Sequence, residues 1–162
     1  LSGEPGIGKS RLVQELKQLV KQDGVSQLLV PSGRQVEYRC APQYQNSTFY
    51  PIIELLTRLL QFGLDDTPED KLGKLERALH SSALPVQEYT PLLAALLSVP
   101  LPKRYAPLSL SPQKHKDKTQ QALLSWLFTE TQQRPVLLVW EDVHWADPST
   151  LELLDALCVD DD

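Results

Sequence analysis

Near the start of the chain, three glycines, a lysine and a serine have the spacing of a phosphate-binding loop. The segment fits G-x-x-x-x-G-K-[ST] and consists of Gly3, Glu4, Pro5, Gly6, Ile7, Gly8, Lys9 and Ser10. Glycine allows backbone conformations that a β-carbon blocks, so successive N–H groups can turn toward one anion. The Lys9 amine can then reach the β- and γ-phosphates of a nucleotide, and the Ser10 hydroxyl can bind the accompanying Mg²⁺.

Such a loop requires a helix that opens at its end, and the sequence predicts one. The apolar residues that follow recur with helical spacing and form one stripe, which consists of Leu12, Val13, Leu16, Leu19 and Val20. Gly24 is a natural stop for this helix. A strand should also precede the loop, but only Leu1 and Ser2 stand before Gly3. The alternative interpretation is a glycine-rich turn ahead of an ordinary amphipathic helix.

A second candidate for nucleotide chemistry lies late in the chain, where an apolar run at residues 136–140 ends in Glu141 and Asp142. Unbroken apolar character predicts a strand of a parallel sheet that is covered on both faces. Hydrolysis needs an acid that fixes Mg²⁺ and a group that orients the attacking water. Adjacent strand residues point to opposite sides, so we assign Glu141 to the metal and Asp142 to the water, and the reverse assignment stays open. The alternative is a solvated acidic pair that ends a buried strand.

Between these two segments the sequence predicts one further strand and a loop that leaves it. Residues 27–30 and 35–39 are β-prone, and one or both should form the strand. Residues 41–50 lack periodicity and are interpreted as a loop. Tyr44 and Asn46 are candidates to lie near a nucleotide, with ordinary loop packing as the alternative.

Proline and capping residues mark the expected helices. These cover about residues 51–63, 67–80, 90–97, 112–132 and 148–157, and the prolines, Thr67 and Asp147 supply their start signals. We expect the first four to form a helical insertion at about residues 51–132. Three lysines at residues 114–118 are interpreted as a solvated face or, alternatively, as a site for an acidic partner.

Length and composition predict a single globular domain, and the alternation of strand and helix patterns makes it an α/β domain. The 162 residues are 41% hydrophobic, enough for a globular core, and the net charge of −5 gives no support for nucleic acid or an anionic membrane as a partner. No apolar run is long enough to cross a bilayer, so we expect a cytoplasmic protein.

Cys40 and Cys158 lack a metal-type spacing and are expected to be buried free thiols. The chain has no methionine and starts inside a motif, so we expect it to be a piece of a longer protein.

Two stretches together resemble the AAA-like ATPase module of STAND signalling proteins. They are residues 3–13, GEPGIGKSRLV, and residues 139–151, VWEDVHWADPSTL. Residues 40–47, 50–53 and 91–112 are similar in particular to modules linked to class III adenylate/guanylate cyclases, which also occur in LuxR-type regulators. The resemblance covers nearly the whole chain, and the His-Trp-Ala-Asp stretch at residues 144–147 is more specific than the loop.

This resemblance implies a three-layer P-loop NTPase fold of the ASCE type, with a parallel sheet in the order 5-1-4-3-2. The Walker A motif is then residues 3–10 and the Walker B motif residues 136–142. By that strand order the chain is truncated at both ends, since most of strand 1 and all of strands 4 and 5 are missing. The Walker B strand would have an exposed apolar edge, so we expect the isolated piece to be poorly stable or to aggregate.

The resemblance also implies ATP and Mg²⁺ as cofactors and assigns site residues. The catalytic set is Lys9, Glu141 and Asp142, the metal set is Ser10, Glu141 and Asp142, and the nucleotide contacts are Gly3, Glu4, Pro5, Gly6, Ile7, Gly8, Lys9, Ser10, Arg11 and His144. The family pair is often two aspartates, so Glu141 departs from it and leaves open which acid serves the metal. His144 either senses the γ-phosphate or has a capping or packing role, and Trp145 is expected to pack.

The expected function is an ATP-binding, slowly hydrolysing regulatory switch module of a larger signalling protein, such as an adenylate/guanylate cyclase or a transcription regulator. Its partners would be ATP or ADP and the output and sensor domains of the same chain. The alternatives are a motor-type AAA ATPase, an inactive nucleotide-binding scaffold and a small-molecule P-loop kinase.

Overall fold

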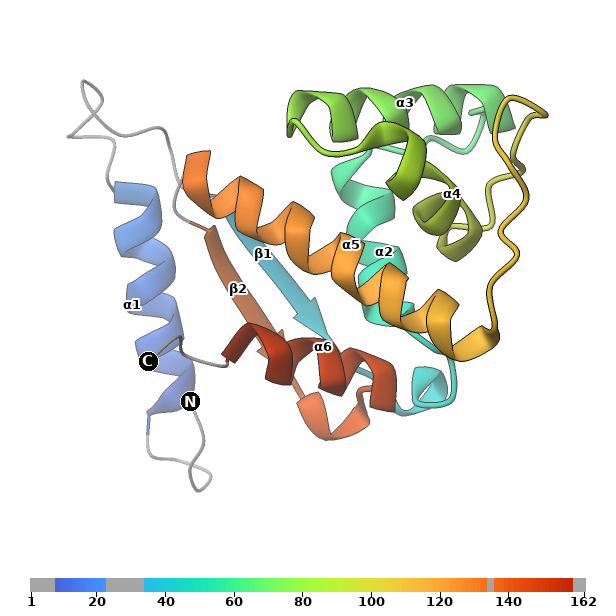
Figure 1. Cartoon of the computed structure of the whole chain (residues 1–162). Helices are drawn as coiled ribbons and strands as arrows, with labels where there is room; N and C mark the ends of the chain where they lie inside the picture. Colours follow the sequence, from blue (N-terminus) through green and yellow to red (C-terminus); the bar gives the residue numbers. More distant parts are fainter. Residues whose placement is uncertain (1–7, 23–33, 134–135, 159–162) are drawn as a thin grey trace.

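The computed structural model describes residues 8–22, 34–133 and 136–158. The chain is a mixed α/β protein (Figure 1). Its elements are α1 (Lys9–Gln22), β1 (Arg34–Arg39), η2 (Pro42–Tyr44), α2 (Tyr50–Leu59), α3 (Pro68–Ser81), α4 (Val86–Leu96), α5 (Pro112–Gln133), β2 (Val136–Glu141), η3 (Val143–Trp145) and α6 (Pro148–Cys158). Among the described residues, no helix combines the length and the apolar character needed to cross a membrane.

The two strands pair in parallel, and within the described residues they make up the whole sheet. Arg34 lies opposite Val136, and Arg39 lies opposite Glu141. Parallel strands run in the same direction, so the carboxyl ends of β1 and β2 meet at one edge. The β-prone run at residues 35–39 is therefore confirmed as a strand, whereas the run at 27–30 lies outside the described residues.

The apolar run at residues 136–140 forms β2 as predicted, but its burial is incomplete in the described structure. Val139 is buried, while the other four residues of the run are only half-buried. One edge of β2 pairs with β1, and among the described residues no strand pairs with its other edge, which leaves this edge open. On α1, which lies beside the strands in Figure 1, Leu12 and Leu16 are 47% and 38% exposed.

Two of the predicted helix starts are confirmed in atomic detail. Thr67 caps α3, where its hydroxyl accepts from the backbone N of Asp70 at 3.2 Å and its own N–H donates to the Asp70 carboxylate at 3.0 Å. This reciprocal arrangement is a capping box. Asp147 caps α6, because its Oδ1 accepts from the backbone N of Ser149 and of Thr150 at 3.1 Å each.

The predicted start of α4 at Thr90-Pro91 is wrong, because the helix begins at Val86. Thr90 is fully buried, and Pro91 lies inside the helix. A proline there removes one helical hydrogen bond. The burial of residues 90–94 offsets this loss, so tertiary packing overrides the local signal.

The predicted end of α2 at Gly63 is also wrong, since the helix ends at Leu59. Gln61 has a left-handed φ of 53°, and the N–H of Phe62 donates to the carbonyl of Thr57 at 3.0 Å. This is a Schellman ending built without glycine. The helices α3 and α4 end in the same way, with left-handed Ala83 and Ser98. The sequence gives little warning of such endings because glycine is their usual marker.

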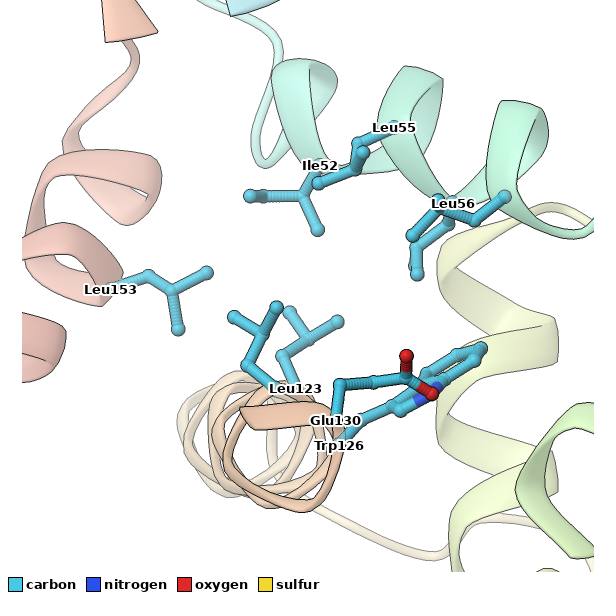
Figure 2. A pocket seen from close by; sticks show the side chains of 9 residues that line it. Ile52, Leu55, Leu56, Leu123, Trp126, Glu130 and Leu153 are labelled. Carbon is cyan, nitrogen blue, oxygen red and sulfur yellow. The ribbon is translucent and has the colours of Figure 1, made fainter. Parts of the chain in front are cut away.

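The main core is formed by α2, α3, α4 and α5, which lie between the two strands in the sequence, together with α6. Its largest fully buried side chains are leucines. These are Leu72, Leu75, Leu79, Leu92, Leu93 and Leu153. A small cavity of about 40 Å³ lies where α2, α5 and α6 meet, and Figure 2 shows the side chains that line it. Its one charged lining residue is Glu130, whose negative charge would repel phosphate. This cavity is therefore not a nucleotide site.

The lysine-rich start of α5 contacts acidic residues of the same chain. Lys116 pairs with Glu152 of α6 at 2.5 Å, and Lys118 pairs with Glu88 of α4 at 3.4 Å. These pairs connect α5 to its neighbours at the surface, where single ion pairs stabilise a fold only slightly. The structure thus gives these two lysines partners within the domain rather than leaving them for an external acidic partner.

The core predicts a sharp contrast between two leucine truncations in the intact protein. Leu93 has no exposed surface, whereas Leu64, between α2 and α3, is fully exposed. Leu93→Ala should lower the free energy of unfolding by about 3 kcal/mol, because it removes buried methyl groups and leaves a cavity. Leu64→Ala should change it by less than about 0.5 kcal/mol. Urea unfolding followed by tryptophan fluorescence measures both, and equal losses would contradict the described core.

Candidate nucleotide site

The end of the predicted phosphate loop is described from Gly8 onward, whereas residues 3–7 and the side chains of Lys9 and Ser10 lie outside the described part. Gly8 has a left-handed φ of 88°, and a β-carbon added there would meet no atom within 4 Å. Glycine is thus required at this position for the backbone conformation and not for space. The predicted helix after the loop is confirmed as α1.

The first turn of α1 is suited to an anion. Its first helical hydrogen bond runs from the N–H of Leu12 to the carbonyl of Gly8, at 3.0 Å. The N–H groups of the three preceding residues therefore have no partner within the helix, and the helix dipole adds a partial positive charge there. No acidic residue occupies this turn, and Arg11 is exposed in it. These features match those of known phosphate sites at helix N-termini.

The acidic pair lies where β2 turns away from the sheet. Glu141 is the last residue of β2, and its carbonyl accepts a hydrogen bond from the N–H of Cys40 at 2.9 Å. Asp142 has left-handed backbone angles, with φ 55° and ψ 41°, and is the residue just before the turn η3. Left-handed non-glycine residues are uncommon and cluster at functional sites. Glu141 is exposed and Asp142 is half-buried, so both carboxylates can reach a ligand at this edge.

The first turn of α1 and the carboxyl ends of both strands lie toward the same end of the molecule, at the bottom of Figure 1. This end therefore combines a turn with unpaired N–H groups and an edge with two acids. Among the described residues, no three His, Cys, Asp or Glu side chains converge to hold a metal ion by themselves. The two carboxylates nevertheless fit Mg²⁺, which prefers oxygen ligands and usually takes one or two protein carboxylates together with phosphate oxygens and water.

Arg39 is a site residue that the sequence reasoning missed. Its Nε donates to the Oδ2 of Asp142 at 2.8 Å, and this hydrogen bond raises the pKa of the guanidinium. The side chains are 74% and 38% exposed, respectively. The available signal was a cation at the end of a β-prone run, but the contact depends on the strand register, which places Arg39 beside Glu141.

His144 and Trp145 follow the acidic pair in η3. The His144 side chain is exposed, and its ring centroid lies 4.9 Å from that of Trp145. Trp145 packs against a small cluster formed by Tyr38, Cys40 and Ala146, in agreement with its expected packing role. The exposure of His144 leaves its ring accessible to a ligand, and the γ-phosphate role remains a prediction.

The two loop candidates differ in their surroundings. The ring of Tyr44 stacks on that of Tyr50, with centroids 3.7 Å apart and planes 9° from parallel. A hydrogen bond with Tyr44 is the main cause that raises the pKa of Tyr50 to about 12. One face of Tyr44 is therefore occupied, which favours the loop-packing interpretation, while Asn46 is exposed.

The two cysteines are both free, but only one lies where expected. Cys40 is buried, and this burial, together with the nearby carboxylates of Asp147 and Asp142, raises the pKa of its thiol. A neutral buried thiol is a poor nucleophile. Cys158 is exposed at the last position of α6, so its predicted burial is wrong. The end of the helix extends past its last buried residue, Leu153, and leaves the thiol in solvent.

Comparison with known proteins identifies the family. The whole chain, residues 1–162, matches the profile of the AAA ATPase domain, and the chain therefore belongs to this P-loop family, which implies nucleotide binding. An uncharacterized protein of Rhizobium meliloti (strain 1021) is 27% identical over 157 residues. The match covers 95% of this chain but only 14% of that relative. No solved structure matches the chain.

The pairing of Arg39 with Asp142 predicts an effect on Mg²⁺-nucleotide binding. The Arg39 guanidinium neutralises part of the negative charge of the acidic pair, so Arg39→Gln should leave more negative charge beside Mg²⁺ and strengthen the binding of Mg²⁺-ATP. Because exposed ion pairs are weak, we expect about a two- to fivefold decrease in Kd by titration calorimetry on the intact protein. Arg77→Gln, at an exposed arginine of α3, is the control and should leave Kd unchanged. Weaker binding by Arg39→Gln would instead indicate a direct phosphate contact.

Proposed function

We propose that this domain binds ATP with Mg²⁺ between the loop at residues 3–10 and the acids Glu141 and Asp142, and hydrolyses it slowly as a switch of a larger signalling protein. Family membership supports nucleotide binding. The observation that carries the rest is that the opening turn of α1 and the acidic strand end lie toward the same end of the molecule. A triphosphate needs the first and its metal ion needs the second.

In this proposal each group has one task. Backbone N–H groups of the loop and the Lys9 amine hold the phosphates, and the Ser10 hydroxyl with one acid holds Mg²⁺. The other acid orients the attacking water, with Glu141 on the metal and Asp142 on the water as the preferred assignment. Mg²⁺ supplies charge neutralisation at the phosphate oxygens. His144, which is exposed and follows the acids, would sense the γ-phosphate.

Several observations support a slow regulatory role. Asp142 already binds Arg39, so the acid assigned to the water is engaged before a nucleotide arrives. The relative is much longer than this chain, which supports further domains on the same polypeptide as partners. We therefore infer that the domain is part of a three-layer ASCE-type ATPase, whose nucleotide state biases the arrangement of output and sensor domains in a cyclase or transcription regulator.

The pair formed by Arg39 and Asp142 also favours a second candidate, a scaffold that binds nucleotide without hydrolysis. In that case the acid would stay paired in every state. A single-turnover assay of phosphate release by the intact wild-type protein separates the two, since only the switch releases phosphate.

Lys9→Ala should weaken the binding of Mg²⁺-ATP to the intact protein by about 100-fold or more. The substitution removes a charge-assisted contact to the phosphates, and such contacts are among the strongest in proteins. The control is Lys17→Ala, on the same helix but about 12 Å further along its axis. Titration calorimetry measures both variants. If Lys9→Ala bound Mg²⁺-ATP with unchanged affinity, the assignment of residues 3–10 as the phosphate-binding loop would be wrong.

Glu141→Gln and Asp142→Asn should separate the roles of the two acids. Asp142→Asn should lower kcat by about 100-fold or more with little change in Kd, because it removes the group that orients water. Asparagine tolerates the left-handed backbone of residue 142, so the turn is preserved. Glu141→Gln should mainly raise the Mg²⁺ concentration needed for nucleotide binding. Steady-state kinetics at several Mg²⁺ concentrations measures both, and the opposite pattern would exchange the two roles.

A further inference from the structure

The ten residues that follow β1 are held at both ends by the last residue of β2 and the segment that follows it. At the first end, the N–H of Cys40 donates to the carbonyl of Glu141 at 2.9 Å. At the second end, the N–H of Phe49 donates to Oδ1 of Asp147 at 3.0 Å. Residues 40–49 and residues 141–147 therefore form one hydrogen-bonded unit, although about a hundred positions separate them in the sequence.

Asp147 is the centre of the second attachment. Its side chain is only 2% exposed, and both of its oxygens are engaged. Besides Phe49, Oδ1 accepts from the N–H groups of Ser149 and Thr150, and Oδ2 accepts from the Thr150 hydroxyl at 2.6 Å. A buried carboxylate is tolerated only with such complete pairing, which the N-terminal end of α6 further stabilises. Asp147 is therefore fixed to α6 and to the start of α2 at once.

Two left-handed residues lie at the ends of this unit. Asp142 has φ 55°, and Phe49, which is buried in the main core just before α2, has φ 58°. Non-glycine residues keep such a conformation only where the surroundings enforce it. Between Asp142 and Asp147 the turn is closed by bonds from Trp145 N to Asp142 O and from Ala146 N to Val143 O, each 2.9 Å. The backbone of Asp142 thus has little freedom while Asp147 stays in place.

We propose that Asp147 is a positioning residue for the acidic pair and links the state of that pair to residues 40–49 and α2. The inference rests on the proposed function and deepens it. By fixing the far end of the turn, Asp147 holds Asp142 at the orientation that water activation needs. When Mg²⁺-ATP draws Asp142 away from Arg39, the displacement passes along the same bonds to Phe49 and the first turn of α2.

The test uses Asp147→Asn and Asp147→Ala in the intact protein. Asparagine retains the shape and one acceptor, so it is the variant most certain to fold. The control is Thr67→Ala, which removes a helix cap from α3, on the opposite side of the core from α6 (Figure 1). Readouts are kcat, the Kd for Mg²⁺-ATP, and amide hydrogen exchange of residues 40–50 with and without Mg²⁺-ATP.

Both Asp147 variants should lower kcat by about 10- to 100-fold, since small misplacements of a catalytic group have effects of this size. Kd should stay within about threefold, and the nucleotide-dependent change in exchange at residues 40–50 should be lost. Thr67→Ala should keep both kcat and the exchange response. Two results would overturn the inference. One is an equal effect of the Thr67 and Asp147 variants on kcat, and the other is a wild-type protein whose amide exchange at residues 40–50 does not change when Mg²⁺-ATP is added.

A ligand-free measurement separates this inference from the proposed function. Asp142→Asn should alter the exchange rate of the Phe49 amide when Asp147 is present, and should not alter it in the Asp147→Asn background. If this coupling is found in a protein that binds no nucleotide, the proposed function fails and the positioning role stands. If the coupling is absent, the positioning role fails whatever the protein binds.

Discussion

The parallel pairing of β1 with β2 is the constraint on which the site depends. It makes Arg39 and Glu141 register partners and brings the carboxyl ends of both strands to one edge. The contact between Arg39 and Asp142, and the bond between Cys40 and Glu141, exist only because of this register. A shift of one residue would turn the side chains at this edge to the opposite face of the sheet and break both contacts.

The end of the molecule where α1 opens and the strands end carries partial positive charge on one element and negative charge on the other. This separation explains how one site could hold both a polyanion and its metal ion. The opening turn of α1 offers N–H groups, a helix dipole and no acid, whereas the strand end offers two carboxylates. Arg39 supplies one of these acids with a counter-ion. Such an exposed pair is weak, so Asp142 can leave Arg39 when a nucleotide binds, whereas the buried carboxylate of Asp147 has no such freedom.

The helical part shows where local signals succeed and where they fail. Thr67 and Asp147 are caps in the structure because a short polar side chain at a helix start satisfies N–H groups that have no partner within the helix. Thr90 and Pro91 carry the same kind of signal but lie inside α4, because burial of the surrounding residues outweighs the missing hydrogen bond. The sequence does not predict the helix ends either, since Gln61 adopts the left-handed conformation that glycine usually provides at a helix end.

The sequence by itself determined the glycine-rich loop, the helix after it, the strand that ends in two acids and the family to which they belong, because these features depend on residues close together in the chain. Only the tertiary structure decided which groups surround the acids. The turn at residues 141–147, which holds the two acids, is contacted by Arg39, Cys40 and Phe49, each about a hundred residues away in the sequence. Local periodicity contains no information about register or about which backbone N–H a buried carboxylate will accept, so these contacts became visible only in the folded chain.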